Sequence, residues 1–325
     1  MTRIKDVAAR AGVSTATVSR VLNGMTVSPD LAAAVQRAVD DLGYTPDRTA
    51  RSLRRRHSEL IALVVPDIEN PFFTSLARGV EDVAREAGLS VVLCNTDEEV
   101  DAQEHYLRIA ADENMAGVVV APAGPSPWLA RLAERDRAVV VVDRPVPDDV
   151  DQVVFDNVDL GLRATRALVE QGHRRIACVT GPRATPTAVD RARGWQQALE
   201  EAGLPADEEL LVHVSFRVDG GESATRQLLD LPEPPDAILA TNNLVGVGVL
   251  RVLSATHHRE VGLGIIGDLP FVTSRVDSTV LLQLRPREMG LTAARMLVAR
   301  IRGESGPAER VIQPTRPVRL GSPAL

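Results

Sequence analysis

The chain has 325 residues, a length at which two or three packed units are more common than a single hydrophobic core. Hydrophobic residues make up 44% of it and charged residues 25%, an ordinary balance for a soluble globular protein. No apolar run approaches the roughly 18 residues that a membrane-spanning helix needs, and the N-terminus enters a polar helical pattern without the apolar core of a signal peptide. We therefore expect a cytoplasmic protein with no membrane partner.

The charge is unevenly distributed along the chain. The formal net charge of −7 would by itself argue against nucleic acid as a partner. Residues 1–56, however, contain ten lysines and arginines against five acidic residues, so this segment carries +5 and the remainder carries −12. A small basic head on an acidic body is the pattern expected when a DNA-binding module is joined to a module that senses a ligand.

The basic head is predicted to consist of three short helices. Apolar residues at helical spacing predict a helix over 4–11, which Gly12 ends in a left-handed turn. Ser14 can cap a second helix over 15–22, and a third helix follows over 29–42. Small polar residues surround one long cation on the exposed face of the second helix, a composition that fits a DNA major groove. The alternative is a helical hairpin used for packing, with a polar face that is only solvated.

The head resembles the DNA-binding head of the lactose-repressor (LacI) family. The resemblance lies in IKDVAARAGVSTATVSRVLN over 4–23 and in VSPDLAAAVQRAVDDLGYTPDRTARSLR, which begins at residue 27. It implies that Thr15, Ala16 and Arg20 face base edges, with the Arg20 guanidinium suited to guanine. It also implies a second set of residues that hold phosphates and fix register rather than sequence. These residues are Ser14, Thr17, Ser19 and Asn23.

Residues 47–58 are predicted to form a hinge helix or linker between head and body. A proline stops the preceding helix and Asp47 can cap a new one, which is too short and too cationic to be stable alone in water. It is expected to fold on DNA, and the alternative in the absence of DNA is a disordered basic linker. The resemblance implies that Arg51, Leu53 and Arg54 contact DNA, with Leu53 wedged into a minor-groove step. Asp47 departs from the asparagine usual in the family and places an anion near DNA.

From residue 60 onward, apolar runs alternate with amphipathic stretches. The apolar runs predict strands within 60–67, 90–97, 117–122, 138–143, 175–182, 210–216 and 237–242. The amphipathic stretches predict helices within 74–88, 101–114, 159–171, 191–203, 221–230 and 244–256. Continuous Val, Ile and Leu runs between helices are typical of parallel strands in a sheet covered on both faces. The predicted body is therefore an α/β unit of two doubly wound parallel-sheet halves, with a cleft between the carboxyl ends of their strands.

This body resembles the effector-binding core of the same family, which is similar to periplasmic sugar-binding proteins. The resemblance is carried by VVPDIENPFF (64–73), CNTDEE (94–99), VDRP (142–145), DNVDLG (156–161), GHRRIACVTGP (172–182), DRARGW (190–195) and ATNNLVGVG (240–248). It implies that a last helix and strands, over about 286–320, cross back between the halves. The predicted domains are a helix-turn-helix head over 1–46, the hinge over 47–58 and a two-lobed effector-binding and dimerisation domain over 59–325.

Polar and aromatic side chains near the ends of these strands are the predicted effector contacts. The candidates are Asp67, Phe72, Phe73, Asp143, Arg191, Phe216, Asn242 and Asp268. By resemblance Arg191, Asp143 and Asn242 are favoured, with Phe73 and Phe216 as stacking or wall residues. Carboxylates, a guanidinium and an amide around aromatic rings suit a small polyol or a heterocycle. The alternative for each residue is an ordinary capping or core role.

Two departures from the family bear on this site. Asn243 stands where the family commonly has aspartate, so one carboxylate is lost. A usual Gly-aromatic-Asp-Asp before Leu-Pro is shortened to GDLP over 267–270. The deletion shifts the backbone there and weakens the assignment of a ligand-binding carboxylate to Asp268.

Enzymatic and metal-binding functions find little support in the sequence. The run GLGIIG (262–267) matches the spacing of a dinucleotide fingerprint, but it does not open a helix, so a dehydrogenase is rejected. The six histidines are scattered, without the arrangement of a catalytic triad or a zinc protease. Cys94 and Cys178 lie in apolar runs without clustered ligands and are expected to be reduced core residues. We expect no catalytic residues, no cofactor and no metal.

The sequence as a whole predicts a DNA-binding transcription repressor controlled by a small metabolite. Two chains are expected to pair through the body, with the helix around 71–88 contributing, so that two heads meet a pseudo-palindromic operator on double-stranded DNA. The favoured effector is a sugar or sugar derivative, with a nucleobase or nucleoside as the alternative, and it either releases the repressor or acts as co-repressor. A transport-type binding protein is the alternative, but it would need a signal peptide and no basic head, and the sequence shows the reverse of both. No leucine heptad follows residue 303, so a coiled-coil tetramer is not expected.

Overall fold

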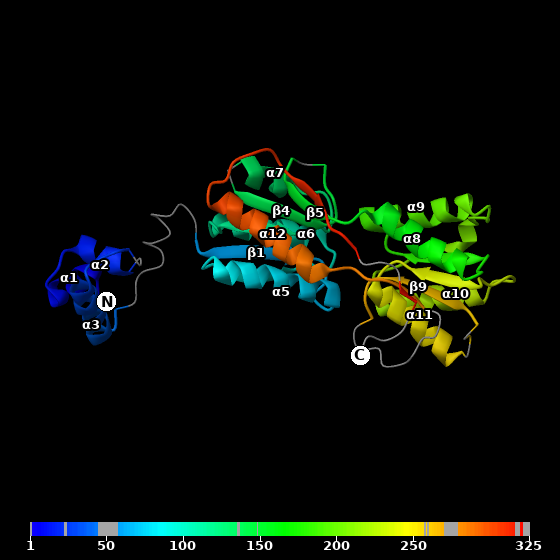
Figure 1. The fold of residues 1–325 in the computed structure, drawn as a ribbon, viewed down its shortest axis with the longest axis horizontal. Coiled ribbons are helices and arrows are strands. Elements are labelled where there is room, and N and C mark those ends of the chain that lie inside the picture. Colours follow the sequence, from blue (N-terminus) through cyan, green and yellow to red (C-terminus); the bar gives the residue numbers. More distant parts are fainter. Residues whose placement is uncertain are drawn as a thin grey trace. The chain divides into compact units, whose positions relative to one another are not determined.

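The computed structural model describes residues 2–22, 25–44, 58–134, 137–147, 149–256, 258, 260–269, 279–315 and 319–320. The chain falls into two compact units, Met1–Ser58 and Glu59–Leu325 (Figure 1). None of the helices in the described ranges has the length and apolar character of a membrane span.

The smaller unit is a bundle of three helices, as the sequence predicts. Its helices are α1 (Ile4–Ala11), α2 (Thr15–Leu22) and α3 (Pro29–Leu42). Gly12 ends α1 with a φ of 68° and Gly43 ends α3 with a φ of 57°, both in the left-handed region that glycine adopts without strain. Val7, Val18 and Val35, one from each helix, are fully buried and hold the bundle together.

The larger unit consists of two lobes, each built on a six-stranded sheet. In the first lobe the strand order is β11-β5-β4-β3-β1-β2, and the strands pair in parallel. Its strands are β1 (Leu60–Val65), β2 (Ser90–Asn95), β3 (Gly117–Val120), β4 (Ala138–Asp143), β5 (Asp151–Val154) and β11 (Arg310–Ile312). Its helices are α5 (Pro71–Glu86), α6 (Val100–Asp112), α7 (Pro127–Glu134) and α12 (Pro286–Ile301).

The central strand β1 shows why helices cover both faces of this sheet. Ile61, Leu63 and Val65 pack into the core that α5 and α12 close. Ala62 and Val64 point to the opposite face and pack into a second core under α6 and α7. Because all five side chains are buried, the strand has no polar face, which is why its sequence is a continuous apolar run.

The second lobe repeats this arrangement. Its strand order is β12-β10-β9-β8-β6-β7, with β10 and β12 antiparallel and the other pairs parallel. Its strands are β6 (Ile176–Thr180), β7 (Leu211–His213), β8 (Ala237–Ala240), β9 (Gly262–Ile266), β10 (Val280–Leu282) and β12 (Arg319–Leu320). Its helices are α8 (Asn157–Glu170), α9 (Pro186–Glu201), α10 (Val218–Leu229) and α11 (Asn243–Ala255). Helices α8 and α9 pack together on one face of the sheet, and α10 and α11 on the other (Figure 1).

The two lobes are not contiguous in sequence. After β10 the chain returns to the first lobe for α12 and β11, and β12 then joins the sheet of the second lobe (Figure 1). The predicted crossing over about 286–320 and the predicted pair of parallel-sheet halves are therefore confirmed.

Some strands differ from the pattern that the sequence indicates. The sequence patterns do not predict β5, β10 or α7, which are short. Within the strand predicted over 210–216, only the three residues of β7 are extended. The preceding residues, Glu208–Leu210, form a 3₁₀ turn. The first five residues of the GLGIIG run form β9, which is buried throughout. Its glycines therefore lie within a strand rather than at a helix N-terminus, in agreement with the rejection of a dinucleotide site.

Pairs of helices approach one another closely at glycines. These pairs are Gly79–Gly290 between α5 and α12, Gly161–Gly194 between α8 and α9, and Gly221–Gly248 between α10 and α11. A Cβ atom added at Gly194 would lie 2.1 Å from the Val158 carbonyl oxygen, and one added at Gly248 would lie 2.2 Å from that of Val218. Since backbone atoms cannot rotate away, these positions have no room for a side chain.

The two cysteines are free and buried, as predicted. Cys94 belongs to the core under α6 and α7, and Cys178 belongs to the core that continues into the second lobe. Burial raises the pKa of both thiols, because the thiolate loses its hydration. Both therefore act as small hydrophobic residues rather than as nucleophiles.

Candidate DNA-binding surface and ligand cleft

Helix α2 presents the small polar face that the sequence assigns to DNA. Thr15, Ala16 and Arg20 are exposed, and Thr17 and Ser19 are partly buried. Among the described residues Arg20 makes no salt bridge, so its guanidinium is available to a base edge. This face matches the prediction in geometry, and its contact with DNA stays a proposal.

The first turn of α2 is fixed by hydroxyl groups. The Ser14 hydroxyl accepts the Thr17 N–H at 3.1 Å, which confirms the predicted cap, and the two side-chain oxygens lie 2.9 Å apart. Hydroxyls at a helix N-terminus are well placed for phosphate, because the helix dipole is positive there. Four further predicted DNA contacts lie outside the described residues: Asn23, Arg51, Leu53 and Arg54. Asp47 lies outside them as well.

A cavity of about 450 Å³ lies between the lobes of the larger unit, where parallel strands of both sheets end. Its lining includes every predicted effector contact, namely Asp67, Phe72, Phe73, Asp143, Arg191, Phe216, Asn242 and Asp268. Doubly wound sheets place ligands at the carboxyl ends of their strands, so the location is the one expected of a binding site.

Together with Arg144, Arg191 is one of two buried arginines in the cavity. Only 5% of it is exposed; its Nε donates to Asn157 Oδ1 at 2.8 Å and its Nη1 donates to the Thr241 carbonyl at 2.6 Å. Burial lowers its pKa, while the charge of Asp143 opposes that effect. One predicted detail is wrong: Arg191 does not open its helix, because α9 begins five residues earlier at Pro186, a residue favoured in a first turn.

Asp143 ends β4 beside this arginine and is also buried. Burial raises the pKa of its carboxyl group, against the opposing charges of Arg191 and Arg144. Its backbone has a φ of 64°, in the left-handed region that non-glycine residues seldom adopt. Glu98, also at the cavity, has the same φ of 64°. Strained backbone of this kind gathers at ligand sites, where the surrounding structure maintains it.

Both terminal nitrogens of Arg144 are bonded within the first lobe, while its buried Nε has no hydrogen-bond partner among the described residues. Its Nη1 and Nη2 each donate to one oxygen of Glu98 at 2.6 Å, and Nη1 also donates to the Pro122 carbonyl at 3.1 Å. Its Nε lies 3.9 Å from Asp143 Oδ2. Burial alone would lower the pKa of Arg144, but Glu98 outweighs it and the pKa is raised.

The start of α11 forms another wall of the cavity. Asn242 Oδ1 accepts the Val245 N–H at 2.8 Å, and Asn242 Nδ2 donates to the Phe216 carbonyl at 3.3 Å. The Phe216 ring covers Gly181, where an added Cβ would lie 2.1 Å from the ring. Neither Asn242 nor Phe216 ends a strand as predicted, since β8 stops at Ala240 and β7 at His213; Asn242 instead caps a helix.

Asn243 links the two lobes. Its Nδ2 donates to Asn70 Oδ1 at 3.0 Å, and the same oxygen accepts the Phe72 N–H at 3.0 Å, which caps α5. An aspartate at position 243 would have no donor for this contact. The departure from the family pattern at this position therefore removes a carboxylate and adds a hydrogen bond across the cleft.

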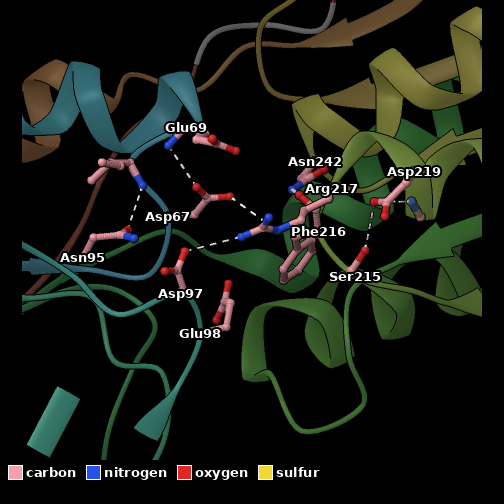
Figure 2. Close-up of polar contacts among 12 residues, drawn as sticks. Asp67, Glu69, Asn95, Asp97, Glu98, Ser215, Phe216, Arg217, Asp219 and Asn242 are labelled. Carbon is pink, nitrogen blue, oxygen red and sulfur yellow. Dashed lines mark hydrogen bonds and ion pairs between the residues drawn. The ribbon is translucent and has the colours of Figure 1, made fainter. Parts of the chain in front are cut away.

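Arg217 spans the cleft from the second lobe. Its Nη2 lies 3.5 Å from Asp97 Oδ1 and its Nε lies 4.0 Å from Asp67 Oδ2. Figure 2 shows Arg217 reaching toward both carboxylates. Asp67 also accepts the Glu69 N–H at 2.9 Å. The Arg217 side chain is 47% exposed, so these pairs are solvent-screened and individually weak.

Several residues of the cavity are absent from the predicted set. Among them are Asp97, Glu98, Thr187, Ser215 and Arg217. The pair Asp97-Glu98 carries a signal in the sequence, because it lies at the end of a predicted strand, as Asp67 does. Arg217 directly follows the predicted strand within 210–216, but nothing in the sequence indicates its partners, which it meets only through the approach of the lobes.

A bundle of helices with an exposed polar recognition helix, together with a two-lobed core around a charged cavity, defines a ligand-responsive DNA-binding regulator. The profile described as "Bacterial regulatory proteins, lacI family" matches residues 3–47. The profile described as "Periplasmic binding proteins and sugar binding domain of LacI family" matches residues 58–316. The chain belongs to the LacI family of bacterial transcription regulators, and it is a DNA-binding regulator rather than an enzyme.

Individual relatives agree with this assignment. The "Ribose operon repressor" of Halalkalibacterium halodurans is 35% identical over 305 residues, which are 93% of this chain and 91% of that protein. The solved structure of a "transcriptional regulator CelR-cellobiose complex" is 32% identical, with a TM-score of 0.73 over 98% of this chain and 99% of that one. A lac repressor dimer bound to operator and the anti-inducer ONPF is 21% identical, with a TM-score of 0.85 over 98% of each chain, and shows the shared fold.

Proposed function

We propose that the protein is a cytoplasmic, homodimeric repressor whose affinity for a pseudo-palindromic operator is set by a sugar or sugar derivative. In this proposal residues 1–46 read DNA, residues 47–58 form the hinge and residues 59–325 bind the effector and the second subunit. The observation that carries it is the presence, in one chain, of the exposed α2 face and of the interlobe cavity. A transport-type binding protein would have no use for the first of these.

The chemistry of the cavity supports a hydroxyl-rich ligand. Arg191 uses Nε and Nη1 within the protein, and among the described residues its Nη2 makes no hydrogen bond, so it can donate to a ligand. Asp143 supplies an acceptor beside it. Phe72 and Phe216 supply apolar walls against which the carbon face of a sugar ring can lie.

A nucleobase is the alternative ligand, because the same aromatic walls can stack on a flat ring. A thermal-shift comparison of sugars with nucleosides separates the two, since a ligand that binds only the native state raises its stability. Binding would draw the lobes together around the ligand, adding to the contact that Asn243 already makes with Asn70. That movement would alter the separation of the two hinges in the dimer and hence the fit of the heads to DNA, with a coupling of about 1–3 kcal/mol.

The first lobe also offers the proposed dimer surface. Ile68 and Leu93, beside the start of α5 and on the edge strand β2, are 42% and 48% exposed. Exposed apolar side chains beside an edge strand favour burial against a second subunit. A two-fold axis through α5 and this edge would set two heads on the halves of a palindrome.

Replacing Arg20 by alanine is expected to remove sequence preference while leaving the weaker, salt-dependent attraction to any duplex. An arginine that makes a paired contact to guanine contributes about 1–3 kcal/mol of discrimination, or roughly 5- to 150-fold in relative affinity. The measurement is a gel-shift titration with DNA from upstream of the gene and with a scrambled duplex of equal length.

Arg37→Ala is the matched control, because Arg37 is an exposed arginine on α3 of the same head. It is expected to lower the affinities for both duplexes by a similar factor, or not at all. If Arg20→Ala retained the full ratio between upstream and scrambled DNA, α2 would not be the element that reads sequence.

A further inference from the structure

The lining of the interlobe cavity includes charged side chains of both signs. Its carboxylates come from Asp67, Asp97, Glu98, Asp143 and Asp268, and its guanidinium groups come from Arg144, Arg191 and Arg217. Among the described lining residues, five carboxylates against three guanidinium groups leave an excess of two negative charges. Were Asp143 protonated, in line with its raised pKa, carboxylates would still outnumber guanidinium groups. An anionic ligand therefore enters against net repulsion.

Two of the three guanidinium groups that could offset this repulsion are already paired with carboxylates. Both terminal nitrogens of Arg144 are bonded to Glu98. Arg217 lies between Asp67 and Asp97, in the position that Figure 2 shows. Arg191 keeps one nitrogen for a ligand, but the opposing charge of Asp143 acts on it directly. A phosphate or carboxylate would have to compete with a protein carboxylate for Arg144 and for Arg217, which leaves Arg191, through its Nη2, as the one arginine of the cavity without a salt bridge among the described residues.

The helix N-termini at the cavity offer an anion little more. Helix α5 begins at Pro71, which has no N–H, and Asn70 accepts the N–H of Phe72. At the start of α11, Asn242 accepts the N–H of Val245. Side-chain caps thus occupy the Phe72 N–H and the Val245 N–H, two backbone donors that would otherwise be open to a phosphate.

We propose that the cavity selects an uncharged ligand over a phosphorylated or carboxylated one, and that Asp67 and Asp97 set this selectivity by engaging Arg217. The proposal rests on the cavity being the effector site. It narrows the ligand to a free sugar or a similar neutral molecule. It also predicts that removal of the two carboxylates allows an anionic ligand to bind, because the Arg217 guanidinium then lies beside the ligand space without these partners.

The test uses the full-length protein and its D67N/D97N variant, with glucose 6-phosphate and inorganic phosphate as probes and sodium chloride of equal ionic strength as reference. Thermal shift and isothermal titration calorimetry are the readouts. The wild type is expected to respond to the phosphates no more than to chloride. The variant is expected to bind glucose 6-phosphate at least about tenfold more tightly than the wild type, because two repelling charges are gone and one guanidinium is released.

Two further variants test whether the gained binding depends on Arg217 and its carboxylate partners. Asp97→Asn alone affects an exposed side chain at a φ of 51°, a conformation that asparagine tolerates, so it keeps the test readable if the double variant does not fold. It is expected to show part of the gain. Arg217→Gln in the double variant is expected to abolish the gained binding.

Phosphate binding by the wild type that Arg217→Gln removes would overturn the proposal, as would the absence of any gain in D67N/D97N and Asp97→Asn. Operator binding is scored separately by gel shift. Its loss would contradict the proposed function without affecting the charge selectivity of the cavity, so the two failures are distinguishable.

Discussion

Replacing Arg191 by leucine is expected to destabilise the larger unit by about 3–5 kcal/mol and to abolish its response to the effector. The Arg191 guanidinium is buried and donates to Asn157 Oδ1 and to the Thr241 carbonyl. Leucine leaves both acceptors unpaired. It also removes the positive charge that opposes protonation of the buried Asp143 carboxyl. Since Arg191 also carries a donor for the ligand, stability and effector binding are lost together.

Urea unfolding followed by tryptophan fluorescence measures this effect, because both tryptophans, Trp128 and Trp195, lie in the larger unit. Arg193→Leu is the control on the same helix. The Arg193 side chain is 64% exposed and pairs with Asp190 at 3.2 Å, so its loss is expected to change stability by no more than about 0.5 kcal/mol. Equal stability of the Arg191 and Arg193 variants would show that the buried guanidinium does not stabilise the larger unit.

Gly290→Ala is expected to destabilise the larger unit by about 3 kcal/mol. A Cβ at this position would lie 2.2 Å from the Leu76 carbonyl oxygen, so α5 and α12 have to separate. Alanine is worth about 1 kcal/mol more than glycine in a helix, and the clash is expected to exceed that gain. Because Phe72 and Pro286 line the cavity from the first turns of these two helices, the effector response is expected to weaken as well.

Gly306→Ala provides the comparison. Its added Cβ would meet only the flexible end of the Arg300 side chain, at 3.5 Å, so stability is expected to stay within about 0.5 kcal/mol of the wild type. Urea unfolding compares the free energies of unfolding of the two variants. A Gly290→Ala protein as stable as Gly306→Ala would mean that the helices tolerate a wider spacing than their packing indicates.

The strands could be predicted where burial on both faces makes the sequence a continuous apolar run. Strands β1 and β4 are covered on both faces, so every position is apolar or nearly so and the run is visible without an alignment. Strand β9 is equally buried, yet Gly262 and Gly264 make its sequence match the spacing of a dinucleotide fingerprint. The reason is packing: a Cβ at Gly262 would meet the His173 ring at 2.2 Å, and one at Gly264 would meet Leu168 at 3.0 Å.

The cavity could be predicted as far as strand ends mark it. That rule and the family resemblance bring together residues as distant as Asp67 and Asp268, because parallel strands of both sheets open onto one cleft. The partners of Arg217 and the bond from Asn243 to Asn70 could not be predicted, because they depend on how closely two separately folded sheets approach. Neither local propensity nor periodicity encodes that separation.

Fluorescence anisotropy of a labelled operator decides whether the head and the cleft of this chain act as one switch. Titrations are run at several salt concentrations, with and without the sugar that gives the largest thermal shift. The expected result is salt-sensitive, sequence-specific binding whose Kd changes about 5- to 150-fold with the sugar, while the operator changes the affinity for the sugar by the same factor. A sugar that binds the purified dimer yet leaves the operator Kd unchanged would contradict the account.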